Sequence, residues 1–224
     1  LEPRVQGLQP AAASRRFPSY LAPAMTQLPE LPLTLSRQEI RKMIRQRRRA
    51  LTPEQQQEMG QQAATRMMTY PPVVMAHTVA VFLSFDGELD TQPLIEQLWR
   101  AGKRVYLPVL HPFSAGNLLF LNYHPQSELV MNRLKIHEPK LDVRDVLPLS
   151  RLDVLITPLV AFDEYGQRLG MGGGFYDRTL QNWQRYQMQP VGYAHDCPLV
   201  EKLPVEEWDI PLPAVVTPSK VWEW

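Results

Sequence analysis

Residues 152–177 read LDVLITPLVAFDEYGQRLGMGGGFYD, and the fold class follows from this stretch. It begins with an apolar run over residues 152–157, passes through a glycine-rich loop, and enters a segment with helical character at Phe175. A short apolar run rich in β-branched residues is typical of a strand that is buried on both faces of a parallel sheet. The order of strand, glycine loop and helix therefore predicts an α/β protein with a mostly parallel sheet.

Strand and helix patterns also alternate along the rest of the chain. The capping box Ser36-Arg-Gln-Glu39 predicts the start of one helix, and Thr52-Pro53 predicts the start of a second that runs to about Met68. We expect further strands at residues 77–84, 104–110, 117–123, 191–194 and 214–217, and further helices at residues 91–102 and 175–188.

Length and composition favour one globular domain. The chain has 224 residues, of which 44% are hydrophobic and 21% charged, so a wholly disordered chain is excluded. Residues 1–24 hold four prolines and show no helical or strand period, and the first methionine is Met25. We therefore expect residues 1–24 to be a disordered extension and residues 25–224 to form a single domain.

The cysteine content and hydropathy bear on the compartment. Cys197 is the single cysteine, which excludes an intramolecular disulfide and a CxxC motif and fits a reducing environment. No apolar run is long enough to cross a bilayer. We expect a cytoplasmic protein without a membrane partner.

Positive charge is concentrated in one predicted helix. Seven cations lie between Ser36 and Ala50 against Glu39 alone, although the whole chain has a net charge of only +1. The rest of the chain is therefore net negative, which argues against a general polyanion-coating role. Four of these arginines recur at helical spacing and form one stripe: Arg37, Arg41, Arg45 and Arg48. Such a stripe can grip a triphosphate, form a solvated basic face, or bind RNA phosphates.

The glycine-rich loop indicates phosphate binding. Five of the 11 glycines fall between Gly166 and Gly174. A strand, a glycine loop and a helix in succession bring bare backbone N–H groups together, which is how many proteins cradle phosphates. The loop is neither a Walker loop nor GxGxxG. A tight turn that needs positive φ angles is the structural alternative.

Two charged residues flank the glycines. Asp177 either complements the dipole of the predicted helix or, beside a phosphate, helps to hold Mg²⁺. Arg168 is either a surface loop residue or a stabiliser of charge on a transferring phosphoryl group. The sequence has no HExxH or GxSxG motif, and phosphoryl transfer needs positioning and charge neutralisation rather than a protein nucleophile.

Four ordered motifs together resemble the 5-formyltetrahydrofolate cyclo-ligase family. They are the basic capped helix with Arg37 and Arg41, the segment Phe82–Thr91, the loop Gly166–Asp177, and Leu203–Asp209 ahead of Ala214–Thr217. The resemblance covers about residues 36–220. It implies a three-layer α/β sandwich with a mostly parallel sheet, similar to the sugar-phosphate isomerase and CoA-transferase type. It also implies ATP- and Mg²⁺-dependent conversion of 5-formyltetrahydrofolate to 5,10-methenyltetrahydrofolate with release of ADP and phosphate.

The resemblance also implies roles for individual residues. Arg168 and Asp177 would be catalytic, Asp177 and Asp209 would bind Mg²⁺, and Leu83 and Glu88 would contact the folate. The ATP-binding residues would be Arg37, Arg41, Arg168, Leu169, Gly170, Met171, Gly172, Gly173, Gly174, Phe175 and Tyr176. The substrate would also touch Met171, Gly172, Gly173, Gly174 and Phe175. Many family members carry cations where this chain has Met171 and Gly173, so Arg45, Arg47 and Arg48 are candidates to compensate.

Two other functions remain open on the sequence. One is an RNA-associated protein that uses the arginine helix, although that helix lacks interleaved aromatic residues. The other is a folate binder without ATP chemistry, which the missing loop cations would permit. We expect 5-formyltetrahydrofolate and ATP as partners, no nucleic acid, and a monomer.

Overall fold

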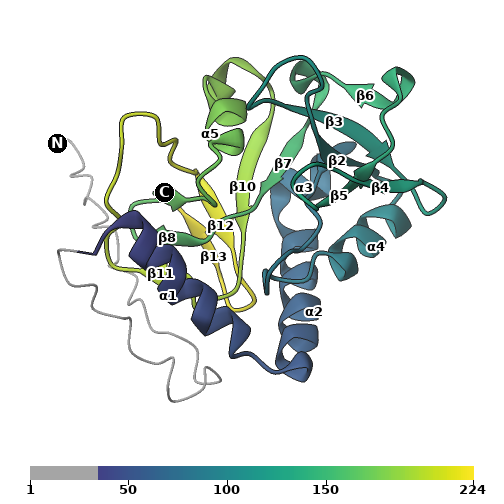
Figure 1. The fold of residues 1–224 in the computed structure, drawn as a ribbon. Helices are drawn as coiled ribbons and strands as arrows, with labels where there is room; N and C mark the ends of the chain where they lie inside the picture. The colour runs from purple at the N-terminus through teal and green to yellow at the C-terminus, as the bar shows by residue number, and fades with distance from the viewer. Residues whose placement is uncertain (1–34) are drawn as a thin grey trace, which may run out of the picture.

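The computed structural model describes residues 35–224, so the expectation for residues 1–24 lies outside the described residues (Figure 1). The α-helices are α1 (Arg37–Arg49), α2 (Pro53–Thr69), α3 (Pro71–Met75), α4 (Gln92–Arg100) and α5 (Phe175–Leu180). Short 3₁₀ turns span Val143–Asp145, Leu149–Arg151 and Trp183–Arg185. The strands are β1 (Thr78–Ala80), β2 (Arg104–Leu110), β3 (Leu118–Tyr123), β4 (Leu129–Met131), β5 (His137–Pro139), β6 (Val146–Leu147), β7 (Val154–Thr157), β8 (Ala161–Asp163), β9 (Arg168–Leu169), β10 (Gln189–Tyr193), β11 (Leu199–Val200), β12 (Ala214–Val216) and β13 (Val221–Glu223).

The main sheet has eight strands in the order β13-β12-β10-β7-β1-β2-β3-β6. The five central strands, from β12 to β2, pair in parallel, whereas β13, β3 and β6 add antiparallel pairs at the two edges. This arrangement confirms the prediction of an α/β protein with a mostly parallel sheet. The central strands are buried on both faces, which is why their sequences are continuously apolar.

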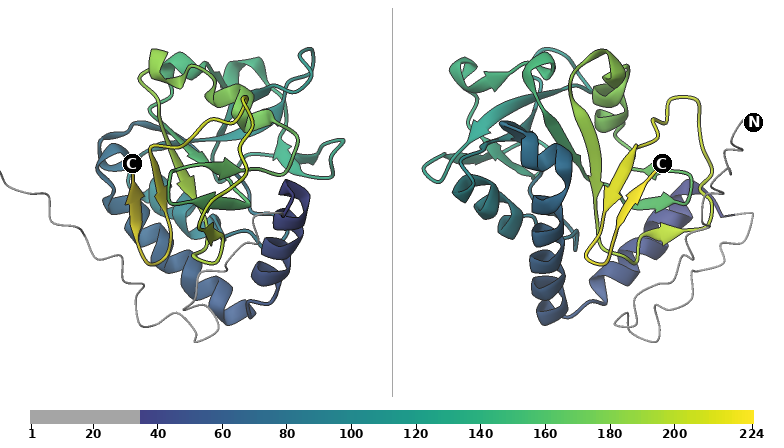
Figure 2. Two further views of the ribbon diagram at one scale, coloured as in Figure 1. Left: turned by 90° about the vertical axis from the view of Figure 1, so that its left-hand side faces the viewer. Right: turned by 180° about the vertical axis from the view of Figure 1, so that it is seen from behind.

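The two faces of the sheet are covered by different elements. Helices α2, α3 and α4 pack on one face, where they meet β7 residues Val154 and Ile156 (Figure 2). Leu155 points to the opposite face and packs with Leu180 of α5 and with Trp222. Side chains alternate across a strand, so a single apolar run supplies both cores.

A second, three-stranded sheet lies beside the main sheet, in the order β11-β8-β9. Helix α1 covers it with its apolar side, where Ile40 and Ile44 contact Val160, Leu169 and Val200. Helix α1 is thus packed on the small sheet (Figure 1), and two of its arginines, Arg37 and Arg41, line a pocket.

The predicted helix starts are confirmed. The Ser36 hydroxyl accepts a hydrogen bond from Glu39 N at 3.2 Å. At α2 the Thr52 and Gln55 side chains cap each other's backbone N–H groups, with Pro53 in the first turn. Thr91 stands at the cap position of α4, but its hydroxyl donates to Phe82 O at 2.6 Å instead of capping the helix.

Two predicted elements are too long. The strand expected over residues 77–84 pairs only as β1, Thr78–Ala80, because the chain then turns into a loop in which Asp86 and Gly87 have positive φ angles of 51° and 74°. The helix expected over residues 175–188 ends at Leu180, since Asn182 adopts a left-handed conformation with φ 60°. Among residues 35–224, no helix has the length and apolar character that crossing a membrane requires.

Candidate active site

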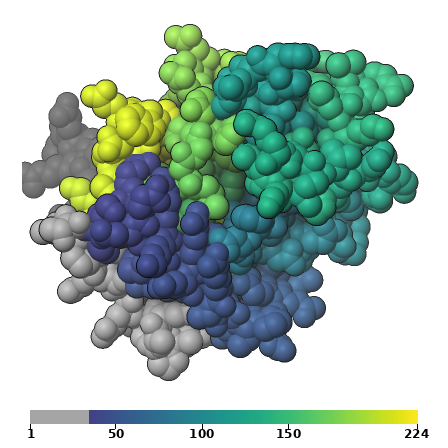
Figure 3. Space-filling model, viewed as in Figure 1, coloured from purple at the N-terminus to yellow at the C-terminus, as the bar shows by residue number. Residues whose placement is uncertain are grey.

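A pocket of about 610 Å³ opens beyond the carboxyl ends of β1, β2 and β7. Its walls come from α1, the glycine loop before α5, and the β4–β5 hairpin, and the surface is hollowed where these segments meet (Figure 3). Ligands of open α/β sheets bind at this end of the strands. The position of the pocket therefore follows from the topology of the sheet.

Most of the residues predicted from the sequence gather in this pocket. Those that line it are Arg37, Arg41, Leu83, Glu88, Arg168, Gly170, Met171, Gly172, Gly173, Gly174, Phe175, Tyr176 and Asp177. Leu169 does not line it, because its side chain is buried under α1 with the small sheet. Asp209 does not line it either, but its carboxylate contacts the lining residue Arg37.

The three consecutive glycines are explained by two different constraints. Gly172 and Gly174 have φ angles of +107° and +72°, which L side chains rarely adopt. A Cβ on Gly173 would lie 2.8 Å from the ring of Phe175. The loop thus meets the requirements of a tight turn and also brings bare backbone against the pocket, so the two interpretations of the glycines are compatible.

Two buried arginines fix the position of this loop. Arg41 of α1 donates from Nε to Gly170 O at 2.7 Å, and Arg168 donates from Nε to Pro158 O at 2.8 Å. Burial lowers the pKa of both groups, and Arg37 and Arg45 lower that of Arg41 further. Since each Nε is used by the protein and Arg168 Nη1 lies beside Asp177, the Nη nitrogens of Arg41 and Nη2 of Arg168 are the donors left to meet an anion in the pocket.

The acidic residues stand next to cations. Arg37 and Asp209 form a two-point contact, from Nη1 to Oδ2 at 2.5 Å and from Nη2 to Oδ1 at 3.0 Å. Asp177 Oδ1 lies 3.6 Å from Arg168 Nη1 and accepts from Ile210 N at 3.4 Å. The Ile210 contact brings the pocket-lining Asp177 beside the residue that follows Asp209 in the chain.

The arginine stripe faces inward. Arg41 and Arg48 are buried, so the alternative of a solvated basic face is wrong for these two residues. Arg48 donates from Nε to Asp86 O at 2.8 Å, and its Nη2 lies 3.6 Å from Asp86 Oδ2. Arg45 and Arg49 contact the same carboxylate, at 3.6 and 2.5 Å. Three arginines thus converge on one aspartate, which argues against an RNA-binding role for them.

This convergence also bears on the missing loop cations. Arg45, Arg47 and Arg48 do not line the pocket, so they do not replace the cations that the family resemblance led us to expect at Met171 and Gly173. Arg45 instead approaches the Met171 sulfur at 3.6 Å.

Glu88 lies in the pocket wall next to Leu83. Its carboxylate accepts from Phe85 N at 2.9 Å, and burial raises its pKa to about 7 while Arg48 lowers it. The loop that carries Glu88 is the one that Asp86 ties to α1. The position of Glu88 therefore depends on the Asp86 contacts.

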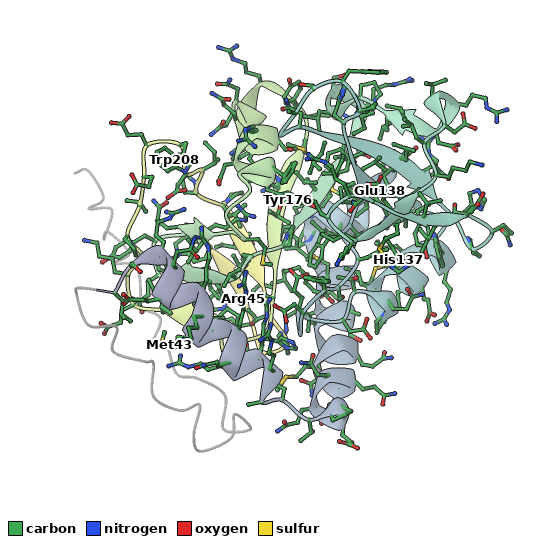
Figure 4. The ribbon with its side chains drawn as sticks, viewed as in Figure 1. Met43, Arg45, His137, Glu138, Tyr176 and Trp208 are labelled. Carbon is green, nitrogen blue, oxygen red and sulfur yellow. The ribbon has the colours of Figure 1, made fainter. Side chains whose placement is uncertain are left out.

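Sequence reasoning missed one wall of the pocket. The β4–β5 hairpin contributes Asn132, Leu134, Ile136, His137 and Glu138, and the loop before Asp209 contributes Trp208 (Figure 4). Glu138 joins the hairpin to the main sheet, because its Oε2 accepts from Leu110 N and from Asn132 Nδ2. The turn at Asn132–Ile136 is the only sequence signal for this hairpin, and it indicates no chemistry.

Fold and site together define an α/β protein whose ligand pocket combines an apolar wall with inward-facing cations. The sequence model of the 5-formyltetrahydrofolate cyclo-ligase family matches residues 34–218. The 5-formyltetrahydrofolate cyclo-ligase of Escherichia coli strain K12 is 98% identical over 182 residues, which are 81% of this chain and 100% of that protein. The protein of the same name from Haemophilus influenzae is 52% identical, over 80% of this chain and 96% of that protein.

Solved structures agree with these matches. The 5,10-methenyltetrahydrofolate synthetase of Aquifex aeolicus superposes with a TM-score of 0.72 at 28% identity, over 84% of this chain and 93% of that chain. The chain belongs to the 5-formyltetrahydrofolate cyclo-ligase family. Membership of this family gives the chain its activity, which is that of an ATP-dependent cyclo-ligase of folate one-carbon metabolism.

Proposed function

We propose that the pocket binds 5-formyltetrahydrofolate and ATP together, and that its residues convert them to 5,10-methenyltetrahydrofolate, ADP and phosphate. The observation that carries this proposal is the convergence of Arg37, Arg41 and Arg168 on one pocket beside the glycine loop. These three guanidinium groups lie together in a chain whose net charge is only +1, with Asp209 beside Arg37 and Asp177 beside Arg168. Guanidinium groups bind phosphate oxygens through paired N–H donors, so a triphosphate suits this side of the pocket.

The phosphate side of the pocket is formed by α1 and the glycine loop. Arg37 and Arg41 hold the phosphates from α1, and Arg168 stands deepest, with 5% of its surface exposed. Residues Arg168, Leu169, Gly170, Met171, Gly172, Gly173, Gly174, Phe175 and Tyr176 form the loop around them, with Leu169 acting through its backbone. Preorganised cations stabilise a transferring phosphoryl group without having to reorganise during the reaction.

Asp177 and Asp209 are the candidates to hold Mg²⁺. Magnesium prefers one or two carboxylates together with phosphate oxygens and water, and Asp177 contacts the residue that follows Asp209. The described residues contain no cluster of three or more His, Cys, Asp or Glu that could hold a metal. Phosphate oxygens and water would therefore supply the remaining ligands, and the ion would neutralise phosphate charge.

The chemistry proceeds in two steps. The formyl oxygen attacks the γ-phosphorus, the bond from the γ-phosphorus to the bridging oxygen breaks, and ADP leaves. N10 then attacks the activated formyl carbon and loses its proton, and the carbon–oxygen bond breaks to release phosphate. Arg168 and Asp177 act at the first step, Arg168 by stabilising phosphoryl charge and Asp177 by orienting Arg168.

The folate side is the apolar wall. Leu83, Glu88 and Phe175 contact the folate, with Phe175 at the pterin, and Gly172–Gly174 let the ring approach the backbone. The hairpin residues Leu134 and Ile136 extend this wall. Closure over an apolar substrate excludes water, which would otherwise compete with N10 for the activated carbon.

Three further proposals concern the fold type, the domain boundaries, and the cellular location and oligomeric state. We propose that the domain has the three-layer arrangement of the sugar-phosphate isomerase and CoA-transferase type, supported by helices on one face of the sheet and α5 with the small sheet on the other. We also propose one domain over residues 25–224. We further propose that the protein is cytoplasmic and monomeric.

The deciding experiment follows the long-wavelength absorbance of methenyltetrahydrofolate with purified protein, 5-formyltetrahydrofolate and Mg²⁺, with and without ATP. An ATP-dependent rise, lost when Mg²⁺ is chelated, is the expected result. Folate binding by calorimetry without any rise would contradict the proposal and favour a folate binder without ATP chemistry.

A further inference from the structure

One polar atom in the pocket wall has no partner. The hydroxyl oxygen of Tyr176 is shielded from solvent and makes no hydrogen bond with the described residues, although the side chain lines the pocket. Buried hydroxyls in native proteins are nearly always hydrogen-bonded, because leaving one unpaired costs free energy. Because Tyr176 also lines the ligand pocket, its unpaired hydroxyl is a candidate donor to a bound ligand.

The Tyr176 ring is held in place by its neighbours. The guanidinium of Arg168 lies over the ring, with its central carbon 5.5 Å from the ring centroid, and Arg168 is itself tied to Pro158 O and to Asp177. Tyr176 is in the first turn of α5, directly after the glycine loop. In Figure 4 it lies between Trp208 on one side and the hairpin residues His137 and Glu138 on the other. The hydroxyl is thus fixed by the same elements that form the phosphate side.

Charges from both halves of the site act on this phenol. Burial raises the pKa of Tyr176 well above its ordinary value, Arg168 lowers it, and Glu88 raises it. The hydroxyl therefore stays protonated at any working pH and is available as a donor. Arg168 belongs to the proposed phosphate side and Glu88 to the proposed folate side, and Tyr176 lines the same pocket as both.

We propose that the Tyr176 hydroxyl is a catalytic hydrogen-bond donor to a non-bridging oxygen of the phosphoryl group as it passes from ATP to the formyl oxygen. This inference rests on the proposed function. The hydroxyl donates without losing its proton, so it changes neither the bonds made and broken nor the leaving groups of either step. A fixed donor that meets the phosphoryl group only in transit stabilises the transition state more than either bound substrate.

The test is Tyr176→Phe, which removes only the oxygen, with Tyr193→Phe as the matched control. The Tyr193 hydroxyl is also buried without a partner among the described residues, but it lies in the core under α2 and α4 and does not line the pocket. Both variants lose an unpaired buried hydroxyl, so both should keep or raise the melting temperature. Tyr193→Phe should keep the kcat of the unaltered protein.

For Tyr176→Phe we expect kcat to fall about 100- to 1,000-fold, the range seen when one oxyanion-hole donor is removed. KM for ATP and for the folate should stay within about twofold, because an interaction made only in the transition state affects kcat and not ground-state binding. The ratio of the kcat of the unaltered protein to that of Tyr176→Phe should be constant across neutral and mildly alkaline pH, since the phenol does not titrate there.

Three results would overturn the inference: an unchanged kcat in Tyr176→Phe, a rise in KM with kcat intact, or a loss of kcat matched by a fall in melting temperature. An unchanged kcat would show that the hydroxyl has no catalytic role. A rise in KM alone would assign it to ground-state binding, and a matched fall in melting temperature would assign it a structural role. A failure of the proposed function is distinguished from all of these, because the unaltered protein would then show no ATP-dependent turnover against which to compare.

Discussion

Arg37 and Asp209 hold each other through both guanidinium nitrogens and both carboxylate oxygens, across 172 residues of sequence. The Asp209 side chain is only 2% exposed, and it also accepts from Glu206 N at 2.9 Å. The pair fastens the loop that carries Trp208 to α1. A residue proposed to grip phosphate and a residue proposed to hold Mg²⁺ are therefore partners before either ligand arrives.

Asp209→Asn tests both roles of this pair. Asparagine keeps one acceptor but loses the charge, so we expect a loss of about 1 to 2 kcal/mol of stability in urea unfolding. We also expect at least about a tenfold fall in kcat/KM together with a higher Mg²⁺ requirement. Asp142→Asn is the control, because Asp142 also forms a two-point pair, with Arg144, and neither residue lines the pocket. An unchanged Mg²⁺ requirement in Asp209→Asn would remove Asp209 from the metal site.

Arg168→Lys tests the deepest cation of the pocket. Lysine keeps the charge beside Asp177 but cannot donate to Pro158 O and to the substrate in the planar geometry of arginine. We expect kcat to fall by about two orders of magnitude while the protein remains folded by circular dichroism. Asp177→Asn should reduce turnover to a similar degree. Full activity in both variants would refute the assignment of these two catalytic residues.

Asp86→Asn tests the arginine cluster that positions Glu88. Asparagine tolerates the positive φ of 51° but removes the charge that faces Arg48, whose side chain is 2% exposed. Leaving a buried cation without its carboxylate should cost about 3 kcal/mol of unfolding free energy. Arg49→Ala is the matched control on the same carboxylate. Its side chain is 60% exposed, so its loss should cost less than about 1 kcal/mol.

Glu88→Gln tests the pH dependence of stability. The pKa of Glu88 is about 7 in the folded protein against 4.5 for an unperturbed carboxyl, so the folded state favours the protonated form. The stability that Glu88 contributes is therefore fully present below about pH 4.5 and is lost as the pH rises through about 7.

We expect wild-type stability to fall by about 2 kcal/mol more than that of Glu88→Gln between pH 5 and pH 8, measured by urea unfolding. Glu58→Gln, on the exposed side of α2, should show the wild-type slope. Parallel curves for the wild type and Glu88→Gln would show that the carboxyl of Glu88 is not buried as described.

The sequence was sufficient where one local rule determines the structure. The caps at Ser36 and Thr52 and the continuous apolar strands predicted α1, α2 and the parallel sheet, because hydrogen bonds to nearby N–H groups and burial on two faces need no distant partner. The glycine loop was identified for the same reason, since positive φ angles restrict the residue type directly.

Tertiary contacts could not be predicted from such local rules. Arg48 is buried with its countercharge supplied by Asp86, in a loop 38 residues further on, and no helical period in α1 carries that information. The β4–β5 hairpin completes the pocket through Glu138 and Leu110, 28 residues apart. The roles of the individual site residues came from family resemblance, and the chemistry of side chains such as Asp209 cannot be recognised locally.

The packing of α1 has a consequence for synthesis of the chain. Among the described residues, its apolar face contacts Leu35 and otherwise only residues from Val160 onward. On the ribosome, this cationic amphipathic helix is made long before the surface that covers it, so its burial must wait for most of the polypeptide. The contact with Asp209 comes later still. A nascent chain therefore has no complete pocket, and cannot bind ligand as the folded protein does, until Asp209 has been made and has folded against α1.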